Sequence, residues 1–234
     1  MDLAPALLSG DRRALARSIT AVEDQRPAAD DLLLAVSSKR RGVPVVGITG
    51  SPGAGKSTLV SSVVEELRRR GRTVAVLAVD PSSPVSGGAV LGDRVRMLDH
   101  VEDQGVYVRS VASRGRVGGL AWTTASIIDL LDAAGFDCVL VETVGAGQSE
   151  VDVAGIADLT VVVTAPGAGD DVQALKAGIL EVADVLVVNK GDLAGADLTR
   201  RDLEAMLALA EGPQVPLLTT TATTGAGVPE LTDG

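Results

Sequence analysis

Residues 43–57 read VPVVGITGSPGAGKS, an apolar run followed by a glycine-rich segment that fits the pattern G-x-x-x-x-G-K-[ST]. The run from Val43 to Ile48 predicts a strand, and the stretch from Ser57 to Arg70 predicts a helix. The glycines let consecutive backbone N–H groups turn toward phosphate oxygens, and the helix N-terminus adds about half a positive charge. A glycine-rich turn without a ligand is the alternative, but the order of strand, loop and helix favours a phosphate-binding loop. The residues expected to bind the phosphates are Gly53, Ala54, Gly55, Lys56, Ser57 and Thr58.

Further apolar runs follow this first strand, with helical patterns between most of them. They are rich in Val and do not alternate with polar residues, which is typical of strands covered on both faces in a parallel sheet. We therefore expect an α/β fold: a three-layer P-loop NTPase with a mostly parallel central sheet that binds its ligand at the carboxyl ends of the strands. The expected strands are Val74 to Val79, Val106 to Val111, Cys138 to Val141, Thr160 to Thr164, Val185 to Val188 and Val215 to Leu218, and the expected further helices are Leu120 to Ala134, Val172 to Leu180 and Thr199 to Ala210.

The segment before the first strand has a different, helical pattern. Leu15 and Ile19 are among the apolar residues at helical spacing, and the Ser-Gly-Asp sequence at residues 9–11 can start a second helix. We expect residues 1–42 to form an N-terminal helical extension that packs beside a P-loop domain of residues 43–234.

Composition excludes several classes of function. The 234 residues carry 31 acidic side chains and 21 Lys or Arg, for a formal charge of −10, so the mean field repels nucleic acid and anionic membranes. One Cys and one His leave no cluster for zinc or nickel and no internal disulfide. No apolar run approaches the ~20 residues of a membrane span. We expect a soluble, cytoplasmic protein with no nucleic-acid or membrane partner.

A second motif follows the strand expected at Val185 to Val188. Residues 189–192 read NKGD, and Asp192 can accept hydrogen bonds from both N1–H and the N2 amino group of guanine. Adenine offers neither donor, and leaving a buried carboxylate unpaired costs roughly 2–4 kcal/mol. Alone, the motif could equally cap a strand–helix turn; downstream of a phosphate loop it predicts GTP or GDP as the ligand. The expected base-binding residues are Asn189, Lys190, Asp192, Thr221 and Ala222, the last through a backbone N–H to guanine O6.

Acidic residues end two other expected strands. Asp80 and Glu142 would point toward the phosphates and can hold Mg²⁺ directly or through water, although a turn or cap role is the alternative for each. Gly145 lies three residues beyond Glu142, a spacing that suits a glycine N–H contacting the γ-phosphate. No residue stands out as the one that orients the attacking water, so we expect slow GTP hydrolysis that a partner accelerates.

Longer strings make a specific resemblance. They read VDPSSP at residues 79–84, LGDR at 91–94, ETVGAGQSE at 142–150 and PGAGDDVQ at 166–173. With the two nucleotide motifs, in this order, they resemble the SIMIBI-class GTPases, and specifically the methylmalonyl-CoA mutase-associated GTPases of the MeaB/ArgK type. The resemblance covers the chain from about Asp11 to its end.

The resemblance implies a function and several residue roles. Members of that family chaperone an adenosylcobalamin-dependent acyl-CoA mutase, and GTP binding and hydrolysis gate cofactor loading and protection. Asp80 and Asp93 would serve Mg²⁺ and a first mobile switch, and residues 142–145 would form a second switch. A third switch at residues 170–176 would contact the mutase through Gln173 and Lys176. Without the resemblance, we would expect this segment to be a solvated loop that leads into a helix.

Two departures from the family pattern accompany the resemblance. Arg116 stands where family members usually have His, and the helices that build the family homodimer would follow Gly234, where this sequence ends. The resemblance implies that a homodimer is possible, but the arm that would build it is not in this sequence. The rival interpretations are a nickel-insertion GTPase, a P-loop kinase that transfers phosphate to a second substrate, and a nucleotide-gated binding module with negligible hydrolysis of its own.

Overall fold

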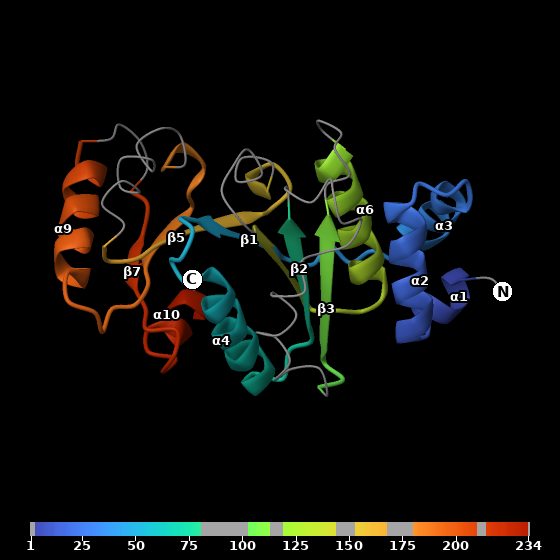
Figure 1. The fold of residues 1–234 in the computed structure, drawn as a ribbon. Helices are drawn as coiled ribbons and strands as arrows, with labels where there is room; N and C mark the ends of the chain where they lie inside the picture. The colour runs from blue at the N-terminus through green and yellow to red at the C-terminus, as the bar shows by residue number, and fades with distance from the viewer. Residues whose placement is uncertain are drawn as a thin grey trace.

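The computed structural model describes residues 3–80, 103–112, 119–143, 153–167, 180–209 and 214–233. Its strands are β1 Val45–Gly50, β2 Val74–Asp80, β3 Val106–Ala112, β4 Cys138–Thr143, β5 Leu159–Thr164, β6 Val185–Val188 and β7 Leu217–Thr219. They form one seven-stranded sheet in the order β3-β2-β4-β1-β5-β6-β7, and every neighbouring pair is parallel (Figure 1). The expected parallel α/β sheet is confirmed.

The centre of the sheet is the place where the strand order reverses. β1 lies between β4 and β5, and the register pairs Ile48 with Glu142 on one side and Gly50 with Val163 on the other. Strands β2 and β3 lie beyond β4, whereas β6 and β7 lie beyond β5. In open α/β sheets ligands bind outside the carboxyl ends of the strands at such a point. β1 therefore brings the glycine-rich loop to the expected binding edge.

Helices cover both faces of this sheet. α4 Lys56–Arg69 and α10 Val228–Asp233 pack on one face with Leu140 of β4, whereas α6 Gly119–Ala133 packs on the other with Val139 and Val141. Because successive side chains of a strand point to opposite faces, a single Val-rich strand contributes to both cores. α9 Ala196–Leu207 covers β5 and β6 on the face opposite α4, through Leu203 and Val162. The sheet is therefore the middle of three layers.

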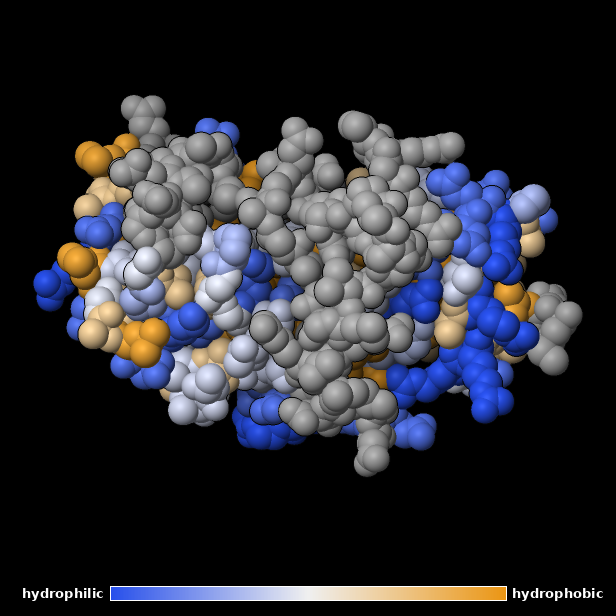
Figure 2. Space-filling view, in the orientation of Figure 1, coloured by the Kyte–Doolittle hydropathy of each residue, from blue (hydrophilic) through white to orange (hydrophobic). Residues whose placement is uncertain are grey.

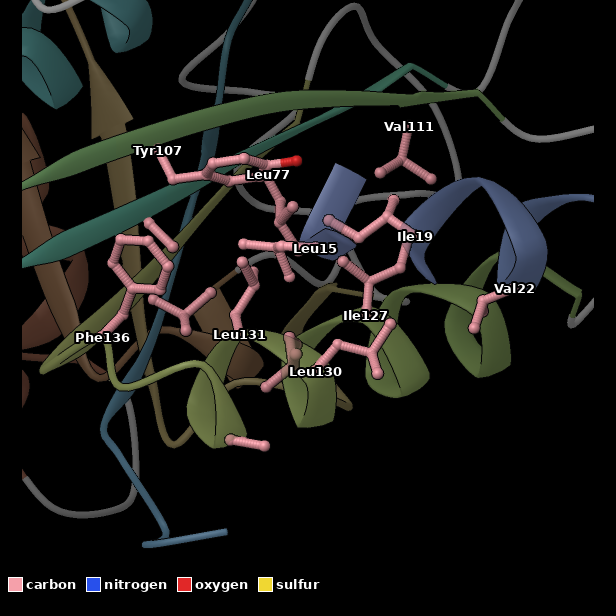
Figure 3. Packing of buried hydrophobic residues seen from close by; sticks show 14 of the residues in the cluster. Leu15, Ile19, Val22, Leu77, Tyr107, Val111, Ile127, Leu130, Leu131 and Phe136 are labelled. Carbon is pink, nitrogen blue, oxygen red and sulfur yellow. The ribbon is translucent and has the colours of Figure 1, made fainter. Parts of the chain in front are cut away.

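Three helices precede the sheet: α1 Leu3–Leu8, α2 Arg12–Glu23 and α3 Ala28–Ser37. Asp11 caps α2 by accepting from the N–H groups of Arg13 at 2.7 Å and Ala14 at 3.1 Å, and these backbone bonds hold the pKa of its carboxyl below the usual value. Leu15 and Ile19 are buried against α6 and the strands (Figure 3). The segment proposed as an extension thus shares its hydrophobic core with the sheet.

Contacts of two arginines also hold α2 against β3, the edge strand. The guanidinium of Arg12 lies over the ring of Tyr107, 5.6 Å from its centroid, and donates to the carbonyl oxygen of Val106. Arg109 of β3 forms an ion pair with Glu23. Since an open edge strand can pair with another chain, these contacts protect the sheet. On the face shown in Figure 2, the surface of these helices is mostly hydrophilic.

Several predicted boundaries are wrong by a few residues, and two of the errors involve proline. β1 begins at Val45 rather than Val43, and β7 begins at Leu217 rather than Val215, because Pro44 and Pro216 have no N–H to donate to a ladder. α9 begins at Ala196, directly after Gly195 with φ 96°, and ends before the predicted residue 210. The helix expected at Val172 to Leu180 lies outside the described residues except for Leu180, which begins the 3-10 helix η2 Leu180–Val182. No helix in the described part of the chain is long and apolar enough to span a bilayer.

Candidate functional site

The loop after β1 has backbone angles that favour glycine. Gly50 and Gly55 have φ angles of 128° and 88°, which side chains rarely tolerate. A Cβ on Gly50 would lie 2.0 Å from the Val163 carbonyl oxygen, and a Cβ on Gly55 would lie 2.6 Å from Asn189 Nδ2. These two glycines allow the loop to approach β5 and the segment after β6, so the phosphate motif and the NKGD motif meet.

Lys56 begins α4 and turns its ammonium group back into the loop. Nζ donates to the carbonyl oxygens of Gly50 at 2.8 Å and Ser51 at 3.1 Å, and the residue is 7% exposed. A buried ammonium group needs hydrogen-bond acceptors, and the loop supplies them. Because the 14-residue helix α4 starts at the same residue, its positive end and this ammonium lie together, an arrangement that favours phosphate.

Ser57 and Glu142 meet directly at the end of β4. Ser57 Oγ donates to Glu142 Oε1 at 2.5 Å, and Glu142 is 3% exposed. The pairing of Ile48 with Glu142 in the β1–β4 ladder brings this carboxylate beside the phosphate loop. A hydroxyl and a carboxylate are the hard oxygen donors that Mg²⁺ prefers, so these two residues fit the ion expected from the sequence.

Of the other residues assigned to the metal and the switches, the structure places only the backbone of Asp80. Asp80 ends β2, two residues beyond Ala78, the register partner of Glu142, so the backbone brings both acids to one edge of the sheet. Asp93, Gly145, Gln173, Lys176 and Arg116 lie outside the described residues, and their assignments stay predictions.

A pocket of about 310 Å³ opens between the phosphate loop and the segments after β6 and β7. It joins the two sequence motifs in one site, as expected for a nucleotide whose phosphates and base are read separately. Its lining consists of Gly55, Thr58, Asn189, Lys190, Asp192, Leu193, Thr221, Ala222 and Thr223.

Asn189 connects the loops that surround this pocket. Its Nδ2 donates to the carbonyl oxygen of Ala54 at 2.9 Å, and its Oδ1 accepts from Thr220 Oγ1 at 3.0 Å and from the N–H of Ala222 at 3.1 Å. The side chain is 1% exposed. Its amide therefore cross-links the phosphate loop to the segment after β7.

Lys190 and Asp192 flank the pocket in different ways. Lys190 has a φ of 58°, and its Nζ donates to the Gly53 carbonyl oxygen at 2.8 Å, so its stem lies across the pocket toward the phosphate loop. Asp192 lines the same pocket and is exposed. Its carboxylate is therefore accessible to a base that enters the pocket.

The backbone amides expected at the base are engaged within the protein. The N–H of Ala222 donates to Asn189, and the N–H of Thr221 donates to the Ala226 carbonyl oxygen at 2.9 Å across a β-bridge. Both residues line the pocket. The proposed contact of the Ala222 N–H with guanine O6 therefore competes with an existing hydrogen bond, and it stays a prediction.

Sequence reasoning missed three residues of this site. Thr220 is buried and donates to Asn189, and Leu193 contributes the apolar wall next to Asp192. The position of Leu193 directly after NKGD could have indicated a base-contacting residue. Ser62 on α4 donates to the Ala222 carbonyl oxygen, and no spacing or motif distinguishes it from the other serines of that helix.

A strand, a glycine-rich loop and a helix that start a parallel sheet, with a pocket that reaches the NKGD segment, define a P-loop nucleotide-binding protein. The family model described as "Methylmalonyl Co-A mutase-associated GTPase MeaB" matches residues 15–234. The chain therefore belongs to the MeaB family of mutase-associated GTPases, and the resemblance seen in the sequence is confirmed. As a member it is a GTPase that binds guanine nucleotides and hydrolyses GTP.

Individual proteins agree with the family match. A protein of Pyrococcus horikoshii, whose name assigns it provisionally as a GTPase, is 49% identical over 236 residues, which cover 98% of this chain and 74% of that protein. A crystal structure titled as a LAO/AO transport system kinase superposes with a TM-score of 0.81 at 31% identity, over 99% of this chain and 72% of that one. The hydrogenase maturation factor HypB of Archaeoglobus fulgidus shares the fold, with a TM-score of 0.60 at 22% identity over 93% of this chain and 96% of that one.

Proposed function

We propose that this GTPase uses its nucleotide state to control association with an adenosylcobalamin-dependent acyl-CoA mutase of the methylmalonyl-CoA mutase type, and so gates cofactor loading and protection in the cytoplasm. The observation that carries the proposal is the family match, whose description names that mutase and which spans residues 15–234. Hydrolysis of GTP would change which loop conformation is populated and hence the affinity for the mutase.

Each residue of the site receives a role in this proposal. Lys56 and the loop N–H groups neutralise phosphate charge, Thr58 contacts the phosphates from the first turn of α4, and Asp192 selects guanine. Gly145 would contact the γ-phosphate, and the mutase would meet Gln173 and Lys176. The residues proposed to serve Mg²⁺ are Ser57, Asp80, Asp93 and Glu142.

The Ser57–Glu142 hydrogen bond supports the metal proposal, because it places two of the proposed Mg²⁺ ligands next to each other. The hydroxyl proton bridges two oxygens that are 2.5 Å apart. When bound, Mg²⁺ supplies positive charge beside the β- and γ-phosphate oxygens. Ser57 would then offer a lone pair instead of a proton, and Glu142 would have to release Ser57. Binding of Mg²⁺ at these two residues would therefore replace the Ser57–Glu142 hydrogen bond.

A binding and turnover experiment tests the mutase proposal. The protein is mixed with purified methylmalonyl-CoA mutase in the presence of GDP or a non-hydrolysable GTP analogue, and complex formation and phosphate release are measured. We expect nucleotide-dependent association and faster phosphate release. Equal association with both nucleotides, together with an unchanged hydrolysis rate, would contradict the proposal and would leave the GTPase assignment intact.

A kinase is the second candidate, because the superposing crystal structure carries a transport-system kinase title. A kinase leaves the labelled γ-phosphate on an acceptor, whereas a GTPase releases it as inorganic phosphate. Incubation with γ-labelled GTP and separation of free phosphate from labelled protein or small molecules distinguishes the two outcomes.

A nickel-insertion function has less support. Among the described residues no group of three or more His, Cys, Asp or Glu could hold a metal ion. Burial raises the pKa of the Cys138 thiol to about 11, which opposes the thiolate that a nickel ligand requires. Titration calorimetry with nickel tests this alternative, and micromolar binding would favour it.

A further inference from the structure

The segment at residues 220–226, called here the base loop, is tied to α4 by a hydrogen bond that neither nucleotide motif contains. Ser62 Oγ donates to the Ala222 carbonyl oxygen at 2.5 Å. Its own helix offers the Thr58 carbonyl oxygen at 3.2 Å, the type of acceptor that a helix serine commonly uses. The shorter distance indicates that the Ser62 hydroxyl serves the base loop more than its own helix.

Ala222 is consequently held from two directions. Its N–H donates to Asn189 Oδ1, next to β6, and its carbonyl accepts from Ser62, on α4. The residue is 5% exposed, so water has little access to replace either partner. Removing the Ser62 hydroxyl would leave a buried carbonyl without the donor described here, which is unfavourable.

The orientation of the next amide follows from peptide geometry. The Ala222 carbonyl and the Thr223 N–H belong to one planar trans unit and point in opposite directions. Fixing the carbonyl toward α4 therefore fixes the direction of the Thr223 N–H. Thr223 lines the pocket together with Asp192, whereas the N–H of Ala222 is already engaged by Asn189.

We propose that Ser62 is a positioning residue for guanine recognition: it orients the Ala222–Thr223 peptide so that the Thr223 N–H donates to the oxygen at position 6 of the base. The inference rests on the proposed base site and adds a reader for a further group of guanine, the oxygen next to N1–H. Asp192 reads the N1–H and N2 groups, and the oriented amide reads O6. An adenine base, with an amino group at position 6, would place a donor against a donor.

The test compares three ligands that separate these contacts. GTP and ITP share O6 and N1–H, and ITP lacks the N2 amino group, whereas inorganic tripolyphosphate reports on the phosphate loop alone. We expect Ser62→Ala to weaken GTP and ITP by the same factor, roughly 3- to 10-fold, and to leave tripolyphosphate affinity unchanged. Ser62→Thr, which keeps the hydroxyl, should restore nucleotide affinity.

A matched control uses another helix serine. Ser37 ends α3, and its Oγ donates to the Leu34 carbonyl oxygen at 2.7 Å in an exposed position. Ser37→Ala should leave the affinities for all three ligands unchanged.

The outcomes keep this inference separate from the base site on which it rests. Unchanged GTP affinity in Ser62→Ala, or an equal loss of tripolyphosphate affinity, would overturn the role of Ser62 while the preference of the wild-type protein for GTP over ATP persists. Absence of that preference in the wild-type protein would instead overturn the base site itself.

Discussion

Polar residues lie at both ends of the parallel strands: at their amino ends, called here the amino edge of the sheet, and at their carboxyl ends, called here the carboxyl edge. The two groups of residues serve different purposes. At the amino edge, acidic side chains bind backbone N–H groups of neighbouring strands. At the carboxyl edge, a lysine, a serine and a glutamate bind one another or the phosphate loop. The comparison teaches that the position of a polar side chain relative to the ends of the strands, rather than its type, decides whether its partner is permanent or can be exchanged for a ligand.

The amino edge shows a repeated arrangement. Asp137, Asp158 and Asp184 each directly precede a strand, and each accepts from an N–H at the start of a neighbouring strand. The acceptor distances are 2.8 Å from Thr73, 2.9 Å from Val45 and 2.7 Å from Thr160. These amides stand at the beginning of ladders and need a partner. The carboxylates supply it, so they align adjacent strands.

The carboxyl edge holds contacts that a ligand can replace. Lys56 donates to loop carbonyls, and Ser57 donates to Glu142. Phosphate oxygens are stronger acceptors for the ammonium than carbonyls, and a divalent cation competes with the hydroxyl proton. Substitution at the carboxyl edge should therefore affect nucleotide chemistry, and substitution at the amino edge should affect stability.

The largest effect is expected for Lys56→Ala. Loss of the ammonium removes the positive charge beside the phosphates and should lower GTP turnover by at least about 100-fold. Phosphate release is measured together with far-ultraviolet circular dichroism to show that the variant is folded. Wild-type turnover in this folded variant would overturn the site assignment.

For Asp192→Asn we expect a change of similar size in nucleotide specificity rather than in turnover. The amide cannot accept from both donors of guanine, so the preference for GTP over ATP should fall about 100-fold. Competition binding with a fluorescent GTP analogue measures both affinities. Asp184→Asn is the control from the amino edge, and it should leave the ratio unchanged.

A moderate effect is expected for Glu142→Gln. The neutral side chain still offers an oxygen to Ser57 but attracts a divalent cation less, so half-maximal turnover should require about tenfold more Mg²⁺. A Mg²⁺ titration of phosphate release is the measurement. A titration curve that coincides with the wild-type curve would remove Glu142 from the metal site.

For Asp137→Asn we expect the smallest effect on nucleotide affinity and a measurable loss of unfolding free energy. The backbone N–H and the hydroxyl of Thr73 both donate to Asp137 at 2.8 Å, and they hold the pKa of this carboxyl below its usual value. Since the folded pKa is below the unfolded pKa, this stabilisation is present above about pH 4 and is lost as the pH falls through the folded pKa. The variant should lose about 1–2 kcal/mol of unfolding free energy at pH 7.

Urea unfolding at pH 7 and at pH 3 checks this last prediction. The difference between the wild-type protein and Asp137→Asn should shrink at the lower pH, while GTP affinity at pH 7 stays the same for both. A difference that is independent of pH would mean that the carboxylate charge does not contribute.

The sequence predicted the order of the strands along the chain and both nucleotide motifs, because each depends on a local pattern. Val-rich runs, glycine spacing and the residue that follows a strand are all visible in a few neighbouring positions. The short displacement of β1 and β7 came from prolines whose missing N–H groups matter only once a neighbouring strand is present. The register between Ile48 and Glu142 likewise needs the assembled sheet.

The remainder of the site could not be predicted because it depends on contacts between distant segments. Ser62 and Ala222 lie 160 positions apart, and no pattern in α4 indicates their hydrogen bond. Asn189 was expected to serve the base, but its side chain is occupied by groups from two loops. The exposure of Asp192 depends on how the segments around the pocket pack, which the motif alone does not describe.

The position of Asn189 has a consequence for the energetics of ligand capture. A single buried amide joins the cradle for the phosphates to the wall for the base through contacts within the protein itself, so the entropy of bringing these two loops together is lost during folding. Guanosine and pyrophosphate, added as separate fragments, would each bind to loops that Asn189 already holds together.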